Sequence, residues 1–394
     1  MSDLPIAHTA AAGPLRLRQL APQWLDQWHH RIEQWMAHPG LYRLALSNPV
    51  TRWFAQRRTR QIFDLMSGFV YSQVLLSCVR LKLFATLQHA PATLEELAAR
   101  CQLPEATLQR LLLSAVSLNL MERRSRQRFG LGPLGVTIAA HDGICAMIEH
   151  NSLLYRDLAE PTAFLQDAWS GQMAAYWPYA HAPASGAAAA ASDVVGRYSA
   201  LMAASQTFVL DEVLNTFAFD QYRCVLDVGA GQGRFVAALA TRFPRLRLQA
   251  FDLPPVLALA RQAHAAQGLP TTVEYHPGSF FTDDLPQGAD LVTLIRVAHD
   301  HPDEQVQRVF QRIFAALPAG GTLLLAEPMA QEPLEAQSED AYFHFYLLAM
   351  GAGRLRTPSE LSQMLRAAGF VYVELLPNAM PIHTRLLVAR KPGG

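Results

Sequence analysis

The 394-residue chain has little cysteine, almost no lysine and no net charge. Its four cysteines form no C-x-x-C pair, which is typical of reduced, mostly buried thiols in a cytoplasmic protein. The 33 basic and 33 acidic residues cancel, which leaves no broad electrostatic footprint for nucleic acid. We expect no signal peptide, because the N-terminal residues lack an uninterrupted apolar stretch. No segment approaches the roughly 20 apolar residues that cross a bilayer. These absences favour a globular cytoplasmic protein.

An acid followed by alternating glycines is the most informative motif: Asp227, Gly229, Gly231 and Gly233. Glycine permits backbone angles and close approaches that a Cβ forbids, so a ligand can lie directly against such a turn. Asp252 ends a second apolar run about one βα unit later, where an acid would hold both ribose hydroxyls. Asp227 could meet an ammonium group. The pattern predicts a ligand with a ribose, an amino-acid end and no phosphate, which describes S-adenosyl-L-methionine. A dinucleotide turn, or a tight turn with two surface acids, are the alternatives.

Short apolar runs alternate with helical segments from residue 224 onward. This alternation predicts an α/β fold with a mostly parallel sheet covered on both faces. The predicted strands are 224–228, 247–252, 272–275, 290–297, 321–326, 371–375 and 384–389. We expect the last two to form an antiparallel hairpin at one sheet edge.

The N-terminal segment from about residue 15 to 61 is predicted to be helical. It carries two groups of side chains: Trp24, Trp28 and Trp35 within a narrow arc, and Arg57, Arg58 and Arg60. A dimer or domain interface is the favoured interpretation of this aromatic face. The alternative is a helix that rests on a membrane surface with its arginines near the head groups.

The next segment has a winged-helix pattern. Thr93 and Glu96 form a capping-box signature before a first helix, a second helix follows Pro104, and residues 121–131 are basic and strand-like. The second helix is mostly leucine, alanine and serine, which suits a partner chain better than a DNA groove. With a low-complexity linker at 183–192, we predict a helical extension (1–66), a winged-helix-like dimerisation domain with linker (67–190) and a catalytic domain (191–394).

Two titratable side chains follow adjacent strands of the predicted sheet. His299 follows strand 290–297, and Glu327 ends strand 321–326. Because ligands bind beyond the carboxyl ends of the strands, we expect both to lie beside the glycine turn. A histidine is the usual base near neutral pH, and a carboxylate behind it would fix its tautomer. Asp300 and His301 could join a metal cluster, but we expect an N-cap and a surface residue instead.

Aromatic residues complete the predicted site. Phe280 follows the third strand and is placed to cover an adenine face, although a core position is the alternative. Several members of the aromatic stretch 342–350 are expected to line an apolar acceptor pocket, because one helix cannot bury them all. The predicted pocket residues are Tyr198, Met202, Phe343, Tyr346 and Met350.

These residues together resemble the plant-type, caffeate O-methyltransferase-like family. The glycine turn, Asp252, His299-Asp300, Glu327 and the run 356–360 occur in that family's order, and the resemblance runs from about residue 69 to 391. It implies a Rossmann-like class I methyltransferase domain after a winged-helix dimerisation domain. It also implies that His299 is the base and that Glu327 orients it. It implies that Gly229 and Asp252 contact the cofactor. The full set of predicted cofactor-binding residues is Asp227, Gly229, Gly231, Gly233, Asp252, Leu253, Ser279, Phe280 and Arg296.

Residues 69–80 and 295–301 are similar to bacterial carotenoid methyltransferases. This resemblance implies methylation of the tertiary C-1 hydroxyl of an acyclic hydroxycarotenoid, such as demethylspheroidene or hydroxyneurosporene. It also implies a homodimer that touches the photosynthetic inner membrane transiently. Two residues depart from the wider family: Ser279 replaces an aspartate near the adenine. Leu355 replaces a second acid beside the histidine, which leaves Glu327 acting alone.

Two alternatives stay open at this point. The same machinery would serve another acceptor, either a phenolic metabolite or a bacteriochlorophyll precursor. A protein of another class, a winged-helix DNA-binding regulator, could keep the turn as a vestigial cofactor site. The two classes differ in whether the chemistry depends on His299.

Overall fold

A computed structural model describes most of the chain as two compact units, Met1–Val74 and Leu75–Gly394. The described residues are 15–36, 38, 40, 47–167, 171–176, 209–269, 271–332, 338–381 and 384–394. The predicted linker 183–192 and the predicted pocket residues Tyr198 and Met202 lie outside them.

The first unit contains α1 (Leu15–Met36) and most of α3 (Pro49–Arg80). The side chains of Trp28, Trp35 and Trp53 are exposed over half or more of their surface. Thr51–Arg80 is long and apolar enough to cross a membrane by length and composition, which the sequence analysis did not anticipate. Only 11% of its most apolar 18-residue window is buried.

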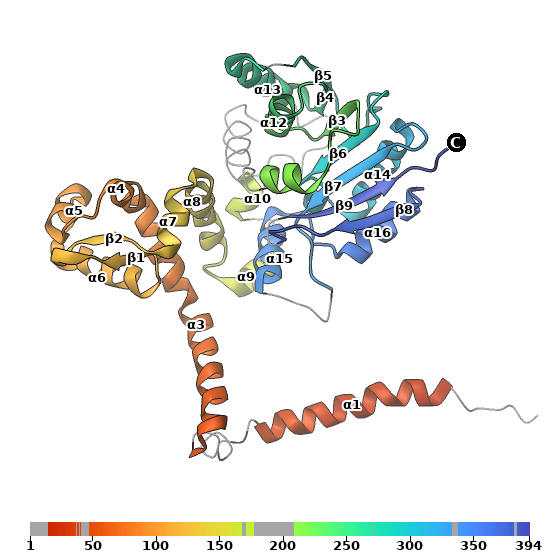
Figure 1. Ribbon diagram of the computed structural model, residues 1–394. Coiled ribbons are helices and arrows are strands. Elements are labelled where there is room, and N and C mark those ends of the chain that lie inside the picture. The colour runs from red at the N-terminus through yellow and green to blue at the C-terminus, as the bar shows by residue number, and fades with distance from the viewer. Residues whose placement is uncertain are drawn as a thin grey trace, which may run out of the picture. The chain divides into compact units, whose positions relative to one another are not determined.

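The second unit begins with a small helical domain that carries a two-stranded wing (Figure 1). Its elements are α4 (Leu83–His89), α5 (Leu94–Cys101), α6 (Glu105–Ser117), β1 (Met121–Arg123), β2 (Phe129–Leu131), α7 (Pro133–Ala139), α8 (Asp142–Asp157), α9 (Pro161–Gln166) and α10 (Gln172–Tyr176). The predicted capping box is confirmed: the Thr93 hydroxyl accepts from the Glu96 N–H, and the Thr93 N–H donates to the Glu96 carboxylate. β1 and β2 pair antiparallel, with Met121 opposite Leu131. The predicted helix-turn-helix and wing are therefore present.

The rest of this unit is built on a seven-stranded sheet in the order β5-β4-β3-β6-β7-β9-β8. Its strands are β3 (Cys224–Val228), β4 (Arg247–Asp252), β5 (Val273–Pro277), β6 (Leu291–Ile295), β7 (Thr322–Glu327), β8 (Tyr372–Leu376) and β9 (Arg385–Arg390). The first five are parallel, and β9 pairs antiparallel with both β7 and β8. Each predicted strand is present within about two residues of its expected bounds. This is the mostly parallel α/β sheet, with an antiparallel pair of strands at one edge, that the sequence predicts.

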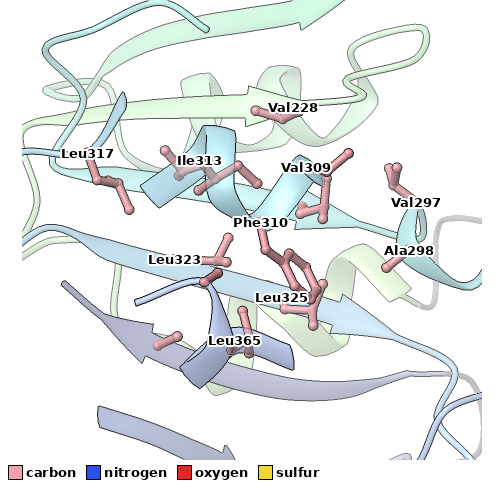
Figure 2. Close-up of a cluster of buried hydrophobic side chains, with 14 of the residues drawn as sticks. Val228, Val297, Ala298, Val309, Phe310, Ile313, Leu317, Leu323, Leu325 and Leu365 are labelled. Carbon is pink, nitrogen blue, oxygen red and sulfur yellow. The ribbon is translucent and has the colours of Figure 1, made fainter. Parts of the chain in front are cut away.

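Helices cover both faces of the sheet, because alternate side chains of each strand point to opposite sides. They are α12 (Arg234–Arg242) and α13 (Pro254–Gln267) on one face, and α14 (Asp303–Ala316) and α16 (Pro358–Ala367) on the other. α15 (Ser338–Met350) packs instead with α8 and α10. Leu323 and Leu325 of β7 pack toward α14 and α16, whereas Leu324 packs with α12 and α13. Figure 2 shows Phe310 of α14 against this side of β7. The two cores fix the sheet, and the carboxyl ends of β3, β4, β6 and β7 consequently meet at one edge.

Candidate active site

The glycine turn follows β3 and has the backbone geometry that only glycine adopts readily. Gly229, Gly231 and Gly233 have φ angles of +75°, +57° and +72°. The N–H groups of Gly229 and Ala230 donate to the carbonyl of Phe251 at 2.9 and 3.2 Å, which ties the turn to the end of β4. A Cβ on Gly231 would meet no atom within 4 Å, so the turn is open there. That open space is where a ligand can approach the backbone.

Two acids border this turn. Asp252 ends β4 and accepts from the N–H groups of Gly231 at 2.7 Å and Leu253 at 2.6 Å. Asp227 is buried in β3 and accepts from the Thr293 hydroxyl at 2.7 Å. Burial raises the pKa of Asp227 to about 7 and that of Asp252 to about 6. A cation bound beside either carboxylate would stabilise its ionised form. An ammonium group beside Asp227 would have this effect.

Three further residues predicted to bind the cofactor lie on loops at the same sheet edge. Phe280 lies next to the turn, since its ring is 3.7 Å from the place that a Cβ on Gly229 would take. The Ser279 hydroxyl accepts from the N–H of Phe281 at 3.3 Å, so it stabilises its own loop. Arg296 follows β6 with a φ of +54°, and its N–H donates to the carbonyl of Ala326 on β7 at 2.8 Å.

His299 and Glu327 form the central contact of the site. The His299 Nδ1 lies 2.5 Å from a Glu327 carboxylate oxygen, and the two side chains are 5% and 1% exposed. Glu327 also accepts from the backbone N–H groups of Val297 at 2.8 Å and Ala298 at 2.7 Å. A carboxylate that accepts two backbone hydrogen bonds is ionised and can only accept. The proton in the contact between Glu327 and His299 is therefore on Nδ1. The two residues therefore meet as the sequence predicts.

The neighbours of His299 differ from the sequence prediction. Asp300 is not an N-cap: Pro302 takes the N-cap position of α14, and Asp300 lies 3.1 Å from the His299 Nε2. The interpretation of His301 as a surface residue is also wrong, since its ring packs edge-on against Phe281 and burial lowers its pKa to about 4. Asp300 ends the short 3-10 turn over 298–300, and His301 follows it. Glu327 is consequently not the only acid that contacts His299.

Arg356 holds this turn from behind, a role that the sequence analysis did not assign. Arg356 is 2% exposed, and its guanidinium donates to the carbonyls of Ala298 and His301 at 2.8 and 2.7 Å. Gly353 packs equally closely, because a Cβ there would fall 2.0 Å from the His299 carbonyl oxygen. The sequence analysis singled out the run 356–360, which includes Arg356, but the sequence alone does not show which backbone carbonyls an arginine will contact.

The predicted acceptor-pocket residues on α15 have unequal exposure. Tyr346 and Met350 are 4% and 1% exposed and pack with buried side chains of α8, α9 and α10, whereas Phe343 is partly buried beside them. The Tyr346 hydroxyl lies 3.2 Å from the Nε2 of His150, whose pKa burial lowers to about 4. Residues from α8 and α15 thus form one apolar wall with a neutral polar contact inside it.

Comparison with known proteins identifies the family. The O-methyltransferase domain model matches residues 155–371, and the O-methyltransferase dimerisation domain model matches 63–140. This chain belongs to the O-methyltransferase family. Two relatives are named demethylspheroidene O-methyltransferase. The protein from Rhodobacter capsulatus is 39% identical over 90% of this chain and 86% of its own length, and that from Cereibacter sphaeroides is 36% identical over 87% and 90%.

Solved structures of O-methyltransferases share this fold. Human N-acetylserotonin methyltransferase, in complex with S-adenosylmethionine, superposes with a TM-score of 0.69 at 23% identity, covering 85% of this chain and 98% of its own. Mitomycin 7-O-methyltransferase gives 0.69 at 22% identity, covering 87% and 100%. S-Adenosylmethionine is the cofactor of this O-methyltransferase, and the open glycine turn with its two acids fits that molecule. Within the described residues, no group of three or more histidine, cysteine or acidic side chains is arranged to hold a metal ion.

Proposed function

We propose that this O-methyltransferase methylates the tertiary C-1 hydroxyl of an acyclic hydroxycarotenoid of the demethylspheroidene or hydroxyneurosporene type. The observation that carries the chemistry is the His299–Glu327 contact beside the open glycine turn. The acceptor is supported by the 39% identical relative, which is named demethylspheroidene O-methyltransferase and aligns over 90% of this chain.

The side chains at the glycine turn have separate tasks in this proposal. Asp252 holds the ribose hydroxyls, Asp227 meets the ammonium end, and the bare Gly231 admits the ligand against the backbone. Phe280 covers the adenine, with Leu253, Ser279 and Arg296 at the edge of the site. When bound, S-adenosylmethionine supplies a methyl group that its positively charged sulfur already activates.

In this proposal His299 accepts the proton of the acceptor hydroxyl, and Glu327 orients His299. Glu327 fixes the imidazole through Nδ1, which leaves Nε2, 3.1 Å from an Asp300 oxygen, as the nitrogen that would receive the acceptor proton. A tertiary alcohol is a weak acid, so its proton leaves as the new carbon–oxygen bond forms and not before it. The protein must also align the acceptor oxygen with the methyl group of the donor. An acceptor held in this position needs no prior activation.

The long apolar acceptor would bind along α15 and α8. Phe343, Tyr346 and Met350 supply an apolar wall, and Tyr198 and Met202 belong to the same predicted pocket. Since Tyr346 and Met350 are nearly inaccessible, a polyene would have to displace neighbouring side chains to reach them. Substitution of Phe343, which is partly buried, is expected to change the KM for the acceptor without changing cofactor affinity.

The dimerisation match supports a homodimer as the working unit. It starts at residue 63, inside α3, where a run of apolar side chains is exposed. The most exposed of these are Phe63 at 55%, Leu65 at 85%, Met66 at 63% and Phe69 at 72%. A second copy of the chain would remove this apolar surface from water.

The segment of α3 before residue 63 fits a transient contact with the photosynthetic inner membrane, on its cytoplasmic side. Trp53 and Phe54 are exposed there, and the Arg57 guanidinium lies 5.6 Å from the Trp53 ring centroid. Residues 51–63 contain four arginines and no acid, which suits anionic head groups.

Sedimentation with phosphatidylglycerol vesicles tests this contact. The variant combines Trp28→Ala with Arg57→Gln, Arg58→Gln and Arg60→Gln, and it should lose most vesicle binding. A charge-matched control replaces the arginines at 123, 124 and 126 on the wing, and it should bind as the wild type does. Equal sedimentation of both variants would contradict the membrane contact.

An acceptor panel tests the function. The purified enzyme is incubated with labelled S-adenosylmethionine and with hydroxycarotenoids, phenols or bacteriochlorophyll precursors. Label in a C-1 methoxy carotenoid supports the proposal, whereas label only in a phenol or a chlorin would replace the acceptor. His299→Ala should lower the rate roughly 100-fold or more. An unchanged cellular phenotype with the inactive variant would favour a winged-helix regulator.

A further inference from the structure

A buried histidine on α13 contacts the last residue of the glycine turn. This residue, His264, is 5% exposed. Its Nε2 lies 2.8 Å from the carbonyl oxygen of Gly233, and its Nδ1 lies 2.6 Å from the hydroxyl oxygen of Tyr275 on β5. The imidazole therefore connects β5 and α13 to the turn where the cofactor is proposed to bind.

The direction of each hydrogen bond in this contact follows from the groups involved. A carbonyl oxygen can only accept, so Nε2 of His264 carries a hydrogen and donates it to Gly233. In a neutral imidazole Nδ1 is then an acceptor, and the Tyr275 hydroxyl donates to it. In the other tautomer the lone pair of Nε2 would face the carbonyl oxygen, and the two acceptors would repel each other. The Tyr275 hydroxyl therefore favours the tautomer that donates to the turn.

The two ends of the glycine turn are held by different parts of the molecule. Backbone N–H groups in its first half donate to the end of β4. Its last residue, Gly233, lies directly against the imidazole, since a Cβ there would fall 2.5 Å from Nε2 of His264. The φ angle of Gly233 is +72°, so its backbone angle and the adjacent ring both require glycine. The imidazole thus fixes the end of the turn that leads into α12.

We propose that His264 is a positioning residue for S-adenosylmethionine, and that Tyr275 keeps its imidazole in the tautomer that this role needs. The inference rests on the proposed placement of the cofactor against the glycine turn. Three glycines give the turn wide conformational freedom when its end is released. A turn that is only part of the time in the binding conformation has a correspondingly higher Kd. The hydrogen bond to Gly233 therefore strengthens cofactor binding through the turn.

Calorimetry with S-adenosylmethionine on two variants of His264 tests this role. His264→Leu keeps an apolar side chain of similar size but donates no hydrogen bond, and its Kd should rise about threefold to tenfold. The Gly233 carbonyl still accepts from the N–H of Ala237 at 2.8 Å, so the substitution leaves it with a partner. His264→Gln places an amide N–H within reach of the same carbonyl, and it should recover most of the affinity.

Tyr275→Phe and Tyr222→Phe form a matched pair for the second hydrogen bond. Each removes the hydroxyl of a partly buried tyrosine. The Tyr222 hydroxyl donates to the Thr322 hydroxyl at 3.2 Å, at the amino end of β7 and away from the glycine turn. Both variants should lower the Tm by a similar amount, but only Tyr275→Phe should raise the Kd, by about twofold or more. Equal Kd values in the two variants would overturn the role of Tyr275.

Nitrogen-15 spectra of the wild-type enzyme give a test that depends on no variant's stability. At mildly alkaline pH, the His264 signals, identified by their absence in His264→Gln, should show a hydrogen on Nε2 and none on Nδ1. The opposite tautomer overturns the proposal. Wild-type affinity in His264→Leu overturns it too, as does a loss that glutamine fails to recover. No measurement uses an acceptor, so the role of His264 is decided independently of the proposed carotenoid.

Discussion

The open space at Gly231 gives a prediction that separates cofactor binding from fold stability. Gly231 and Gly268 have nearly the same backbone, with φ angles of +57° and +61°, and a Cβ on either would meet no atom within 4 Å. Gly268 ends α13, a helix that starts beside the cofactor acids and is 14 residues long. Asp252 and Leu253 lie at the start of α13 and Gly268 lies at its end, about 20 Å along the helix at roughly 1.5 Å per residue.

Alanine at either position should lower the free energy of unfolding by a similar amount. The left-handed conformation costs an L-residue roughly 1–2 kcal/mol, and no steric clash adds to it. Thermal unfolding should show a fall in Tm of about 2–4 °C per kcal/mol for a domain of this size. Only Gly231→Ala places a methyl group where we propose that the cofactor meets the backbone. We therefore expect its Kd for S-adenosylmethionine to rise at least about tenfold, or about 1.4 kcal/mol.

Calorimetry with S-adenosylmethionine and with its demethylated product measures this difference directly. Gly268→Ala should bind both within about twofold of the wild type. Normal affinity in Gly231→Ala would refute the placement of the cofactor against this turn. Equal loss of affinity in both variants would mean that the effect is a general loss of structure.

Three further predictions concern the buried acid Asp227, the arginine that holds the histidine turn (Arg356) and the core residue Phe310. Burial raises the pKa of Asp227 from 3.8 to about 7, so its contribution to the free energy of unfolding is full below pH 3.8 and is lost as the pH rises through about 7. In the proposed site the ionised form of Asp227 meets the ammonium end, so cofactor affinity in calorimetry should rise between pH 6 and 8, and Asp227→Asn should flatten this rise. Arg356→Met leaves the carbonyls of Ala298 and His301 without their donor, and urea denaturation should show a loss of about 1–3 kcal/mol with a reduced kcat. An unchanged kcat would contradict the role of Arg356 in holding the turn that carries His299. Phe310→Ala empties a fully buried position and should cost about 3–5 kcal/mol while cofactor affinity stays normal.

Local patterns in the sequence were sufficient for much of the fold. The alternation of apolar runs predicted each strand of the large sheet, because both faces of a covered parallel sheet must be apolar. Thr93 and Glu96 predicted their capping box, because both partners lie within one helical turn. The spacing of Asp227, Gly231 and Asp252 predicted that the glycine turn and the two acids lie together, since consecutive βα units place their loops at the same edge.

Only the tertiary structure decided the contacts between residues that no local pattern relates. Asp300 had the sequence context of an N-cap, yet the short turn after β6 directs it to Nε2 of His299. Arg356 hydrogen-bonds to the carbonyl of Ala298, which lies 58 positions earlier in the chain. Gly353 has no side chain, so its backbone can pack directly against that of the turn. Tyr346 and Met350 were predicted as pocket residues, but packing against α8, α9 and α10 leaves them buried. In each case the direction of a side chain depends on which distant backbone packs beside it, and residue type and spacing do not encode that direction.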